Sequence, residues 1–188
     1  MVYNSGGRPG HSLILTKPLG TGIYSTALKN RALSQEEEEE MYRLMSVLNR
    51  DASELMCELG AGACTDITGY GLVGHALEMA QESGVTLEID FDSIPFLPSA
   101  RRLADEGFLT GGGMANLEGS KDKVSWREGL KGLEKMLLCD PQTSGGLLVS
   151  LDRDKSETYL EALRARGVSE AACIGRVAEG GEADIIIR

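Results

Sequence analysis

Hydrophobic positions recur with a helical period in some segments of the chain and run continuously or alternate in others. Between Met41 and Leu59 they return every three or four residues, with a break at 49–51, which predicts two consecutive helices. Continuous or alternating apolar runs predict strands at 12–16, 85–91, 147–151, 171–177 and 183–187. Further helical patterns cover 21–30, 71–84, 99–106, 128–138 and 154–166. This order predicts an α+β fold with α/β-like layers, a mixed β-sheet covered by helices.

Polar residues at the ends of these segments indicate where several helices begin and end. Ser34 followed by Glu37 forms a capping box, and the acidic run that follows complements the dipole of the helix. Thr21 is expected to cap the helix before Asn30, and Gly60 to end the helix that contains Leu59.

Three segments show a different pattern. Residues 1–10 are polar and glycine-rich, so we expect a linker remnant there and a folded domain over 11–188. Alternation over 85–91 predicts a half-buried strand, with Glu88 and Asp90 on the polar side. Residues 108–126 have little periodicity, and we expect a long loop of functional importance.

Composition excludes several functional classes. Apolar residues make up 41% of the 188 residues, enough for a core, whereas aromatic residues make up only 5%. The net charge of −10 argues against nucleic acid or an acidic membrane surface as a partner. The four cysteines lack zinc-site spacing, and no apolar run is long enough to cross a bilayer. We therefore expect a reduced, cytoplasmic protein.

The loop at 65–75, TDITGYGLVGH, has the strongest chemical signal. Thr68 is placed to cap the helix that follows, and Gly69 and Gly71 permit a tight turn and a close approach by a ligand. Helix amide groups at such a turn bind anions, and Asp66 just before it is a candidate ligand for a hard cation. Together these features suit nucleotide phosphates with Mg²⁺.

Two other interpretations of this loop remain open at the level of sequence. The first is an ordinary capped turn with a solvated Asp66. The second is a dinucleotide site, because residues 69–74 read G-x-G-x-x-G and Glu88 and Asp90 follow at about the distance of a ribose-binding acid.

Three more polar, glycine-containing loops stand out, at 17–22 (KPLGTG), 111–116 (GGGMAN) and 140–146 (DPQTSGG). Lys17 is more simply a surface lysine than an anion ligand, and Cys139 has no evident base that would make it a nucleophile. The loops that carry Asp66 and Asp140 would converge if the strands beside them are neighbours.

The motifs LTKPLGTG at 15–22, TDITGYGLVGHALEM at 65–79 and LLCDPQTSGGLLVSL at 137–151 occur in an informative order and spacing. In this they resemble the C-terminal half of selenophosphate synthetase (selenide, water dikinase), a phosphotransferase of the aminoimidazole ribonucleotide (AIR) synthetase superfamily. The resemblance covers nearly the whole chain from Gly10 onward. It implies an AIR synthetase C-terminal domain-like fold.

The resemblance also implies an activity and a set of site residues. The family makes selenophosphate, AMP and phosphate from ATP, selenide and water, with Mg²⁺, and its full-length enzymes are expected to be homodimers. Asp66 would be one metal ligand from this domain. Residues expected to line the phosphate side of the cleft are Thr68, Gly69, Gly71, Asn116, Asp140, Thr143 and Ser144.

The family's catalytic Cys or selenocysteine, its nearby lysine and most nucleotide contacts belong to an N-terminal ATP-binding domain that this sequence does not contain. We therefore assign no catalytic residue here and expect the isolated chain to be inactive. Two alternatives remain: a sister enzyme (AIR synthetase, thiamine monophosphate kinase or the hydrogenase maturation protein that dehydrates carbamoyl groups), and a non-catalytic binding module of the same fold.

Overall fold

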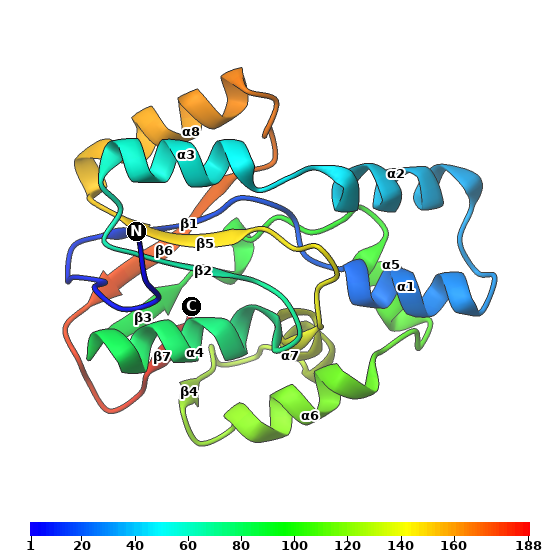
Figure 1. The fold of residues 1–188 in the computed structure, drawn as a ribbon. Helices are drawn as coiled ribbons and strands as arrows, with labels where there is room; N and C mark the ends of the chain where they lie inside the picture. The colour runs from blue at the N-terminus through cyan, green and yellow to red at the C-terminus, as the bar shows by residue number, and fades with distance from the viewer.

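A seven-stranded sheet with helices on both faces organises the chain, and the computed structural model describes all residues from 1 to 188 (Figure 1). The strands are β1 Ser12–Leu15, β2 Ala63–Asp66, β3 Thr86–Ile89, β4 Val124–Ser125, β5 Leu147–Leu151, β6 Ala172–Ala178 and β7 Ile185–Ile187. The α-helices are α1 Thr21–Lys29, α2 Gln35–Ser46, α3 Arg50–Leu59, α4 Gly71–Ser83, α5 Ala100–Asp105, α6 Gly111–Ser120, α7 Gly132–Cys139 and α8 Ser156–Ala165. Two short 3₁₀ turns are η1 Phe91–Ser93 and η2 Arg153–Lys155.

The strand order is β2-β5-β1-β6-β3-β7-β4. In this order the neighbouring strands from β2 to β3 are all antiparallel to one another, whereas β7 runs parallel to both β3 and β4. The prediction of a mixed sheet covered by helices is therefore confirmed. None of the eight α-helices has the length and apolar composition needed to span a membrane.

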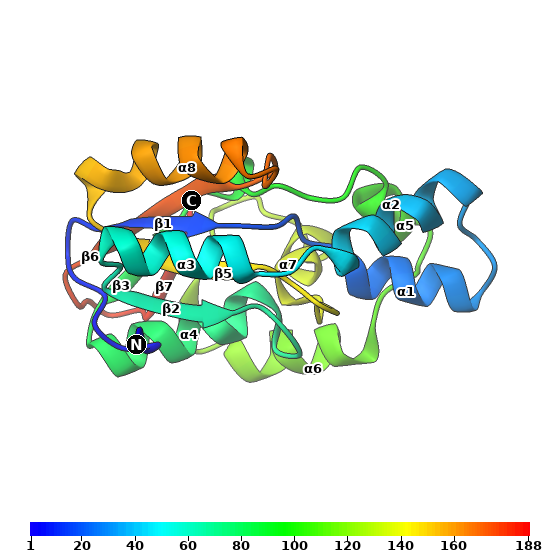
Figure 2. The same ribbon diagram turned by 45° about the horizontal axis from the view of Figure 1, so that its top comes forward.

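Three apolar clusters form the core (Figures 1 and 2). The largest lies between α4 and one face of the sheet, and a second lies where α3 and α8 cover β5 and β1 on the opposite face. The third joins α1, α2 and α5 beyond one edge of the sheet. Aliphatic side chains dominate all three, as the low aromatic content indicated, and each fully buried one contributes roughly 1.5–3 kcal/mol.

The predicted capping box at the start of α2 is confirmed. The Ser34 amide donates to the Glu37 carboxylate at 2.8 Å, and the Glu37 amide donates to the Ser34 hydroxyl at 3.3 Å. Arg102 of α5 pairs with the same carboxylate at 2.5 Å. Hydrogen bonds from Ser99 and from the Ser34 amide, together with Arg102, lower the pKa of Glu37 to about 2.

Glu37→Gln should therefore weaken the acid resistance of the fold. A carboxylate whose pKa is lower in the folded state contributes stability above its unfolded pKa, and this contribution is lost as the pH falls through about 4.5 toward 2. We expect the variant to lose about 1 kcal/mol at pH 7, a modest value because the group is partly solvated. Urea unfolding at pH 7 and pH 2.5 tests this, since the difference in stability between the two proteins should be clearly smaller at pH 2.5 than at pH 7.

The predicted loop over 108–126 is wrong, because α6 and β4 lie within it. Four glycines and the lack of an apolar stripe hide the helix in the sequence GGGMANLEGS. Thr110 caps it by accepting a hydrogen bond from the Gly113 amide at 3.0 Å, and packing against α4 and α7 supports it. Tertiary contacts thus outweigh the low helix propensity of glycine.

The strand predicted at 85–91 forms as β3, but its predicted half-buried character is wrong, because all four residues of β3 are buried. This strand lies between β6 and β7, and the side chain of Glu88 is covered by Arg176 and Arg188, which pair with it. Paired guanidinium groups allow a carboxylate to be buried on the polar side of a strand.

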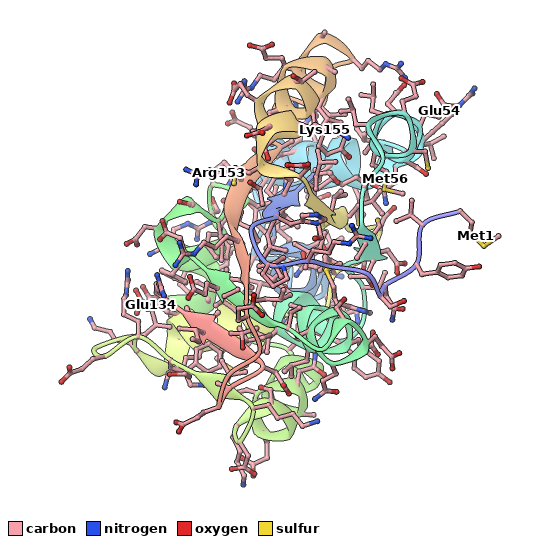
Figure 3. All side chains as sticks on the ribbon, turned by 90° about the vertical axis from the view of Figure 1, so that its left-hand side faces the viewer. Met1, Glu54, Met56, Glu134, Arg153 and Lys155 are labelled. Carbon is pink, nitrogen blue, oxygen red and sulfur yellow. The ribbon has the colours of Figure 1, made fainter.

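The segment 1–10 forms no helix or strand, although several of its residues contact the domain. The Tyr3 carbonyl accepts from the Cys64 amide at 2.7 Å, and the amides of Gly6 and Gly7 donate to the Ser83 hydroxyl. Met1 is fully exposed and extends away from the body of the chain (Figure 3).

Candidate functional site

The four polar loops converge at the edge of the sheet that is formed by the ends of β1 and β2 and the start of β5. Strand β5 lies between β2 and β1 and is antiparallel to both, so that its start lies beside their ends. Asp66 at the end of β2 is opposite Leu147, and Leu15 at the end of β1 is opposite Leu148. The loops 17–22, 66–71 and 140–146 consequently meet there, with the start of α6 beside them.

Backbone contacts hold the loops after β2 and before β5 together. The Ile67 amide donates to the Gly146 carbonyl at 2.8 Å, and the Gln142 amide donates to the Thr68 carbonyl at 2.9 Å. Gly145 lies so close that a Cβ atom on it would stand 2.0 Å from the Ile67 carbonyl oxygen. The two loops therefore form one continuous surface.

Asp140 joins this surface to α1. Its carboxylate accepts from the amides of Gly22 and Ile23 at 3.1 and 3.2 Å, from the Thr110 hydroxyl at 3.2 Å, and from the Gln142 side-chain amide at 3.1 Å. The Asp140 carboxylate thus binds the N-terminus of α1. The predicted cap of this helix by Thr21 is wrong, because Gly20 is the capping residue. Burial raises the pKa of Asp140 to about 6, although these donors favour the charged form. Because the residue is only 1% exposed, its role in this chain is to join loops.

Thr68 and Gly71 also have structural contacts. The predicted cap by Thr68 is wrong, because α4 is capped at Tyr70 and the Thr68 hydroxyl instead lies 3.1 Å from His75 Nε2. Gly71 has a φ of 66° and packs against the backbone of Cys139, where a Cβ atom would lie 2.7 Å from the carbonyl carbon. A side chain there would be both strained and obstructed.

The remaining candidates lie on the outer surface of the same edge. Asp66, Gly69, Thr143 and Ser144 are exposed. Asn116 of α6 donates to the carbonyls of Gly69 and Cys139, each at 3.0 Å, and so fixes α6 beside the turn. Four of the predicted residues are thus accessible to solvent at this edge.

Sequence reasoning missed two buried residues that position this surface. Lys17, expected on the surface, is 3% exposed and donates to the carbonyls of Val47 and Ser144 at 2.7 and 2.8 Å. Burial lowers its pKa. The Gln142 side-chain carbonyl accepts from the Gly20 amide at 2.9 Å and from both the amide and the hydroxyl of Thr21 at 3.2 Å. The only feature of the sequence that could have indicated the buried position of Lys17 is that it directly follows a predicted strand.

The donor set at this edge fits Mg²⁺ only in part. No group of three or more His, Cys, Asp or Glu side chains is arranged to hold a metal. Asp66 is an exposed hard oxygen donor, and Mg²⁺ is commonly bound by one or two carboxylates together with substrate phosphates and water. Asp66 therefore suits the role of a single ligand in a shared site. Cys139 is fully buried, which raises its pKa to about 12 and makes a nucleophilic role unfavourable.

The topology contradicts the dinucleotide interpretation of residues 69–74. That site requires the strands on either side of the glycine turn and its helix to be parallel and close together, whereas β2 and β3 are separated by three other strands. Glu88, the candidate ribose ligand, pairs instead with Arg176 and Arg188.

This arrangement corresponds to a known family. The model for AIR synthase related protein, C-terminal domain, matches residues 8–188, so the chain belongs to that family. Among curated proteins it is similar to selenide, water dikinases, as the three motifs indicated. The relative from Caldanaerobacter subterraneus subsp. tengcongensis is 46% identical over 189 residues, covering 100% of this chain and 54% of the relative. The relative from Geobacter metallireducens is 43% identical over 187 residues, again covering 100% and 54%. The chain thus spans about half the length of the curated relatives it matches.

Solved structures show the same fold. Hydrogenase maturation protein HypE in complex with ATP aligns with a TM-score of 0.71 and 19% identity, over 99% of this chain and 49% of that one. Thiamine monophosphate kinase from Aquifex aeolicus aligns with a TM-score of 0.63 and 22% identity, over 99% and 52%. At these identities the likeness concerns the fold alone.

Proposed function

We propose that the chain acts as the C-terminal domain of a cytoplasmic selenide, water dikinase, in which it forms one wall of the ATP site. The observation that carries this proposal is the exposed edge where Asp66 lies beside the Gly69 turn and the Thr143–Ser144 turn. A phosphate-binding surface of this kind is open on one side. It needs a second domain to close it, and an N-terminal ATP-binding domain of the same polypeptide would supply the opposite wall.

In this proposal each group on the chain has a positioning role. The exposed Gly69 turn and the Thr143–Ser144 turn would orient phosphate oxygens, and Asp66 would hold one side of a Mg²⁺ ion shared with carboxylates of the other domain. When bound, the ion neutralises charge on the phosphate groups of ATP. Asp140, Gln142 and Lys17 keep the loops in place from behind.

Two observations favour this function over the alternatives. The two selenide, water dikinases described above share 43 and 46% identity with the whole chain, whereas HypE and thiamine monophosphate kinase share 19 and 22%. The exposed carboxylate of Asp66 beside the Gly69 turn also suits a shared site for Mg²⁺ and phosphate. The full-length enzyme would use ATP and selenide as substrates and would form a homodimer.

A fusion experiment tests the proposal. The N-terminal half of the Caldanaerobacter relative is joined ahead of this chain, and AMP formation from ATP and selenide is measured with the fusion and with the chain alone. We expect AMP only from the fusion, because half a site supplies neither full positioning nor charge neutralisation. A folded but inactive fusion, or AMP formation by the chain alone, would contradict the proposal.

In the active fusion, Asp66→Asn should raise the Mg²⁺ concentration for half-maximal activity roughly tenfold, because one charged ligand of several is lost. Asp122→Asn changes another exposed aspartate, in the turn after α6, and serves as the matched control. An unchanged Mg²⁺ requirement in Asp66→Asn would remove Asp66 from the metal site.

A further inference from the structure

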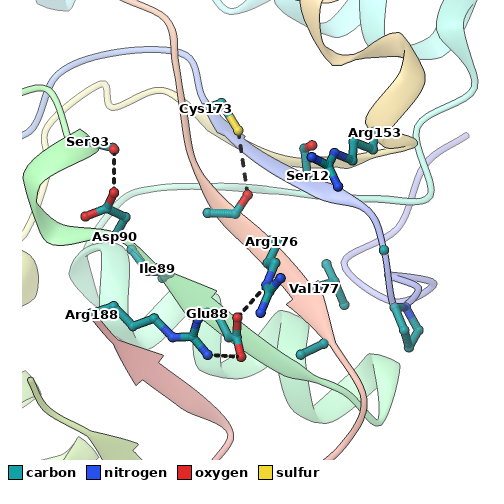
Figure 4. A pocket seen from close by; sticks show the side chains of 14 residues that line it. Ser12, Glu88, Ile89, Asp90, Ser93, Arg153, Cys173, Arg176, Val177 and Arg188 are labelled. Carbon is teal, nitrogen blue, oxygen red and sulfur yellow. Dashed lines mark hydrogen bonds and ion pairs between the residues drawn. The ribbon is translucent and has the colours of Figure 1, made fainter.

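A second hollow, separate from the four-loop edge, lies on the face of the sheet over β6 and β3 (Figure 4). Helices α3 and α8 cover β5 and β1 on this face but do not reach β6 and β3, where the hollow has a volume of about 750 Å³. This size is within the range of small-molecule sites. None of the residues that line it belongs to the site described above.

A β-bulge shapes this hollow. Pairing between β1 and β6 shifts by one residue, since Leu13 is opposite Gly175 whereas Ile14 is opposite Cys173. In a regular strand Cys173 and Arg176 would point to opposite faces. The bulge turns both side chains to the open face, while Ile174 and Val177 stay in the core. Bulges commonly redirect side chains next to functional sites.

Three arginines from three different elements line the hollow (Figure 4): Arg153 of η2, Arg176 of β6 and Arg188 after β7. The buried Glu88 carboxylate holds Arg176 through Nε and Arg188 through Nη2, each at 2.5 Å. The remaining N–H groups of both guanidinium groups stay free to donate to a ligand. Glu88 thereby fixes the two side chains before any ligand arrives.

Three arginines and two carboxylates, Glu88 and Asp90, line the hollow, so its side chains carry one net positive charge. Arg153 takes part in none of the chain's ion pairs. The other lining carboxylate, Asp90, accepts from the Ser93 hydroxyl at 2.8 Å and from the Asp92 amide at 3.2 Å. In a chain of net charge −10, three arginines around one hollow form a local exception. Guanidinium groups recognise phosphate and carboxylate oxygens through paired hydrogen bonds.

We propose that this hollow binds a small molecule through a multiply charged oxyanion, a phosphate or polycarboxylate group held by Arg153, Arg176 and Arg188. The site is independent of the ATP site and of the proposed dikinase function.

The thiol of Cys173 provides a local test. Cys173 is exposed in the hollow, whereas Cys57 is exposed on α3 outside it, so that the two serve as probe and internal control. Alkylation by iodoacetamide is followed at each cysteine by mass spectrometry at constant ionic strength, with increasing pyrophosphate or citrate. We expect the anion to slow the reaction of Cys173 and to leave Cys57 unchanged. The two anions distinguish a phosphate site from a polycarboxylate site.

Arg153→Gln should weaken this protection, raising the half-protecting anion concentration roughly tenfold, because a charge-assisted hydrogen bond is lost without breaking an ion pair. Arg164→Gln, on α8, changes another exposed arginine and should stay within about twofold of the parent. Equal effects of the two variants, or no protection of Cys173 by either anion, would overturn the proposal. The proposal would also be overturned if Cys173 in the fusion protein reacted slowly without any anion and showed no further change when anion was added. This face of the sheet would then be an interdomain contact.

Discussion

Gly145→Ala should disrupt the junction between the loops after β2 and before β5. A Cβ atom at this position would lie 2.0 Å from the Ile67 carbonyl oxygen and 2.9 Å from Gln142 Cβ. The first contact is with backbone and cannot be relieved by rotating a side chain. The loops must separate, and the hydrogen bond from the Ile67 amide to the Gly146 carbonyl is then lost. We expect a loss of about 3 kcal/mol in the free energy of unfolding, at the upper end for overpacking.

Urea unfolding of the parent and variant measures this loss, and Gly119→Ala is the matched control. Gly119 lies in α6 with no atom within 4 Å of its hypothetical Cβ, so alanine should stabilise the helix by about 0.5–1 kcal/mol. The same substitution should thus have opposite effects at two glycines. A Gly145→Ala protein as stable as the parent would show that the two loops are not in rigid contact.

Local sequence patterns carried most of the information about the elements. The capping box at Ser34 and Glu37 and the left-handed Gly60 that ends α3 are formed by residues within four positions of one another. Hydrophobic periodicity similarly located β6, α4 and α8, because one face of each packs on the core, and a continuous apolar run located β5, which is buried on both faces. Where a helix lacked such a face, as α6 does, the pattern predicted a loop.

The site was predictable as a set of loops but not as a set of contacts. Its exposed candidate residues, such as Asp66 and Gly69, were predicted from short motifs. Asp140 was also a candidate, but its partners at Gly22 and Ile23 are 118 and 117 residues away in sequence. No local pattern specifies such partners, because they depend on β5 lying between β2 and β1. The buried position of Lys17 depends on the same arrangement.

The arginine-lined hollow shows the same limit. The alternation expected over 85–91 placed Glu88 on a solvated face, and nothing in that segment indicates the arginines that cover it. Arg176 and Arg188 are 88 and 100 residues away. The bulge in β6 that directs Arg176 outward is a property of the pairing with β1 and has no signature in the sequence of either strand alone.

Asp140→Ala should be among the most damaging single substitutions in the chain. It would leave the amides of Gly22 and Ile23 and the Thr110 hydroxyl without their acceptor in a site that is 1% exposed to water. Each of these unsatisfied buried donors costs about 1–3 kcal/mol. We therefore expect a loss of about 4 kcal/mol in the free energy of unfolding at pH 7. The pKa of Asp140, which burial raises to about 6, leaves the parent carboxylate mostly charged at that pH.

Urea unfolding gives the global effect of Asp140→Ala, and amide hydrogen exchange locates it. The amides of Gly22 and Ile23 should exchange much faster in the variant, because their hydrogen bonds to the carboxylate are gone. Amides in the centre of β6 should lose protection from exchange only by the amount that corresponds to the fall in the free energy of global unfolding. Asp122→Ala, at an exposed position, should change stability by less than about 0.5 kcal/mol. Equal stability of the two variants would show that α1 does not depend on Asp140, and the loops would then be joined mainly through Gln142 and Lys17.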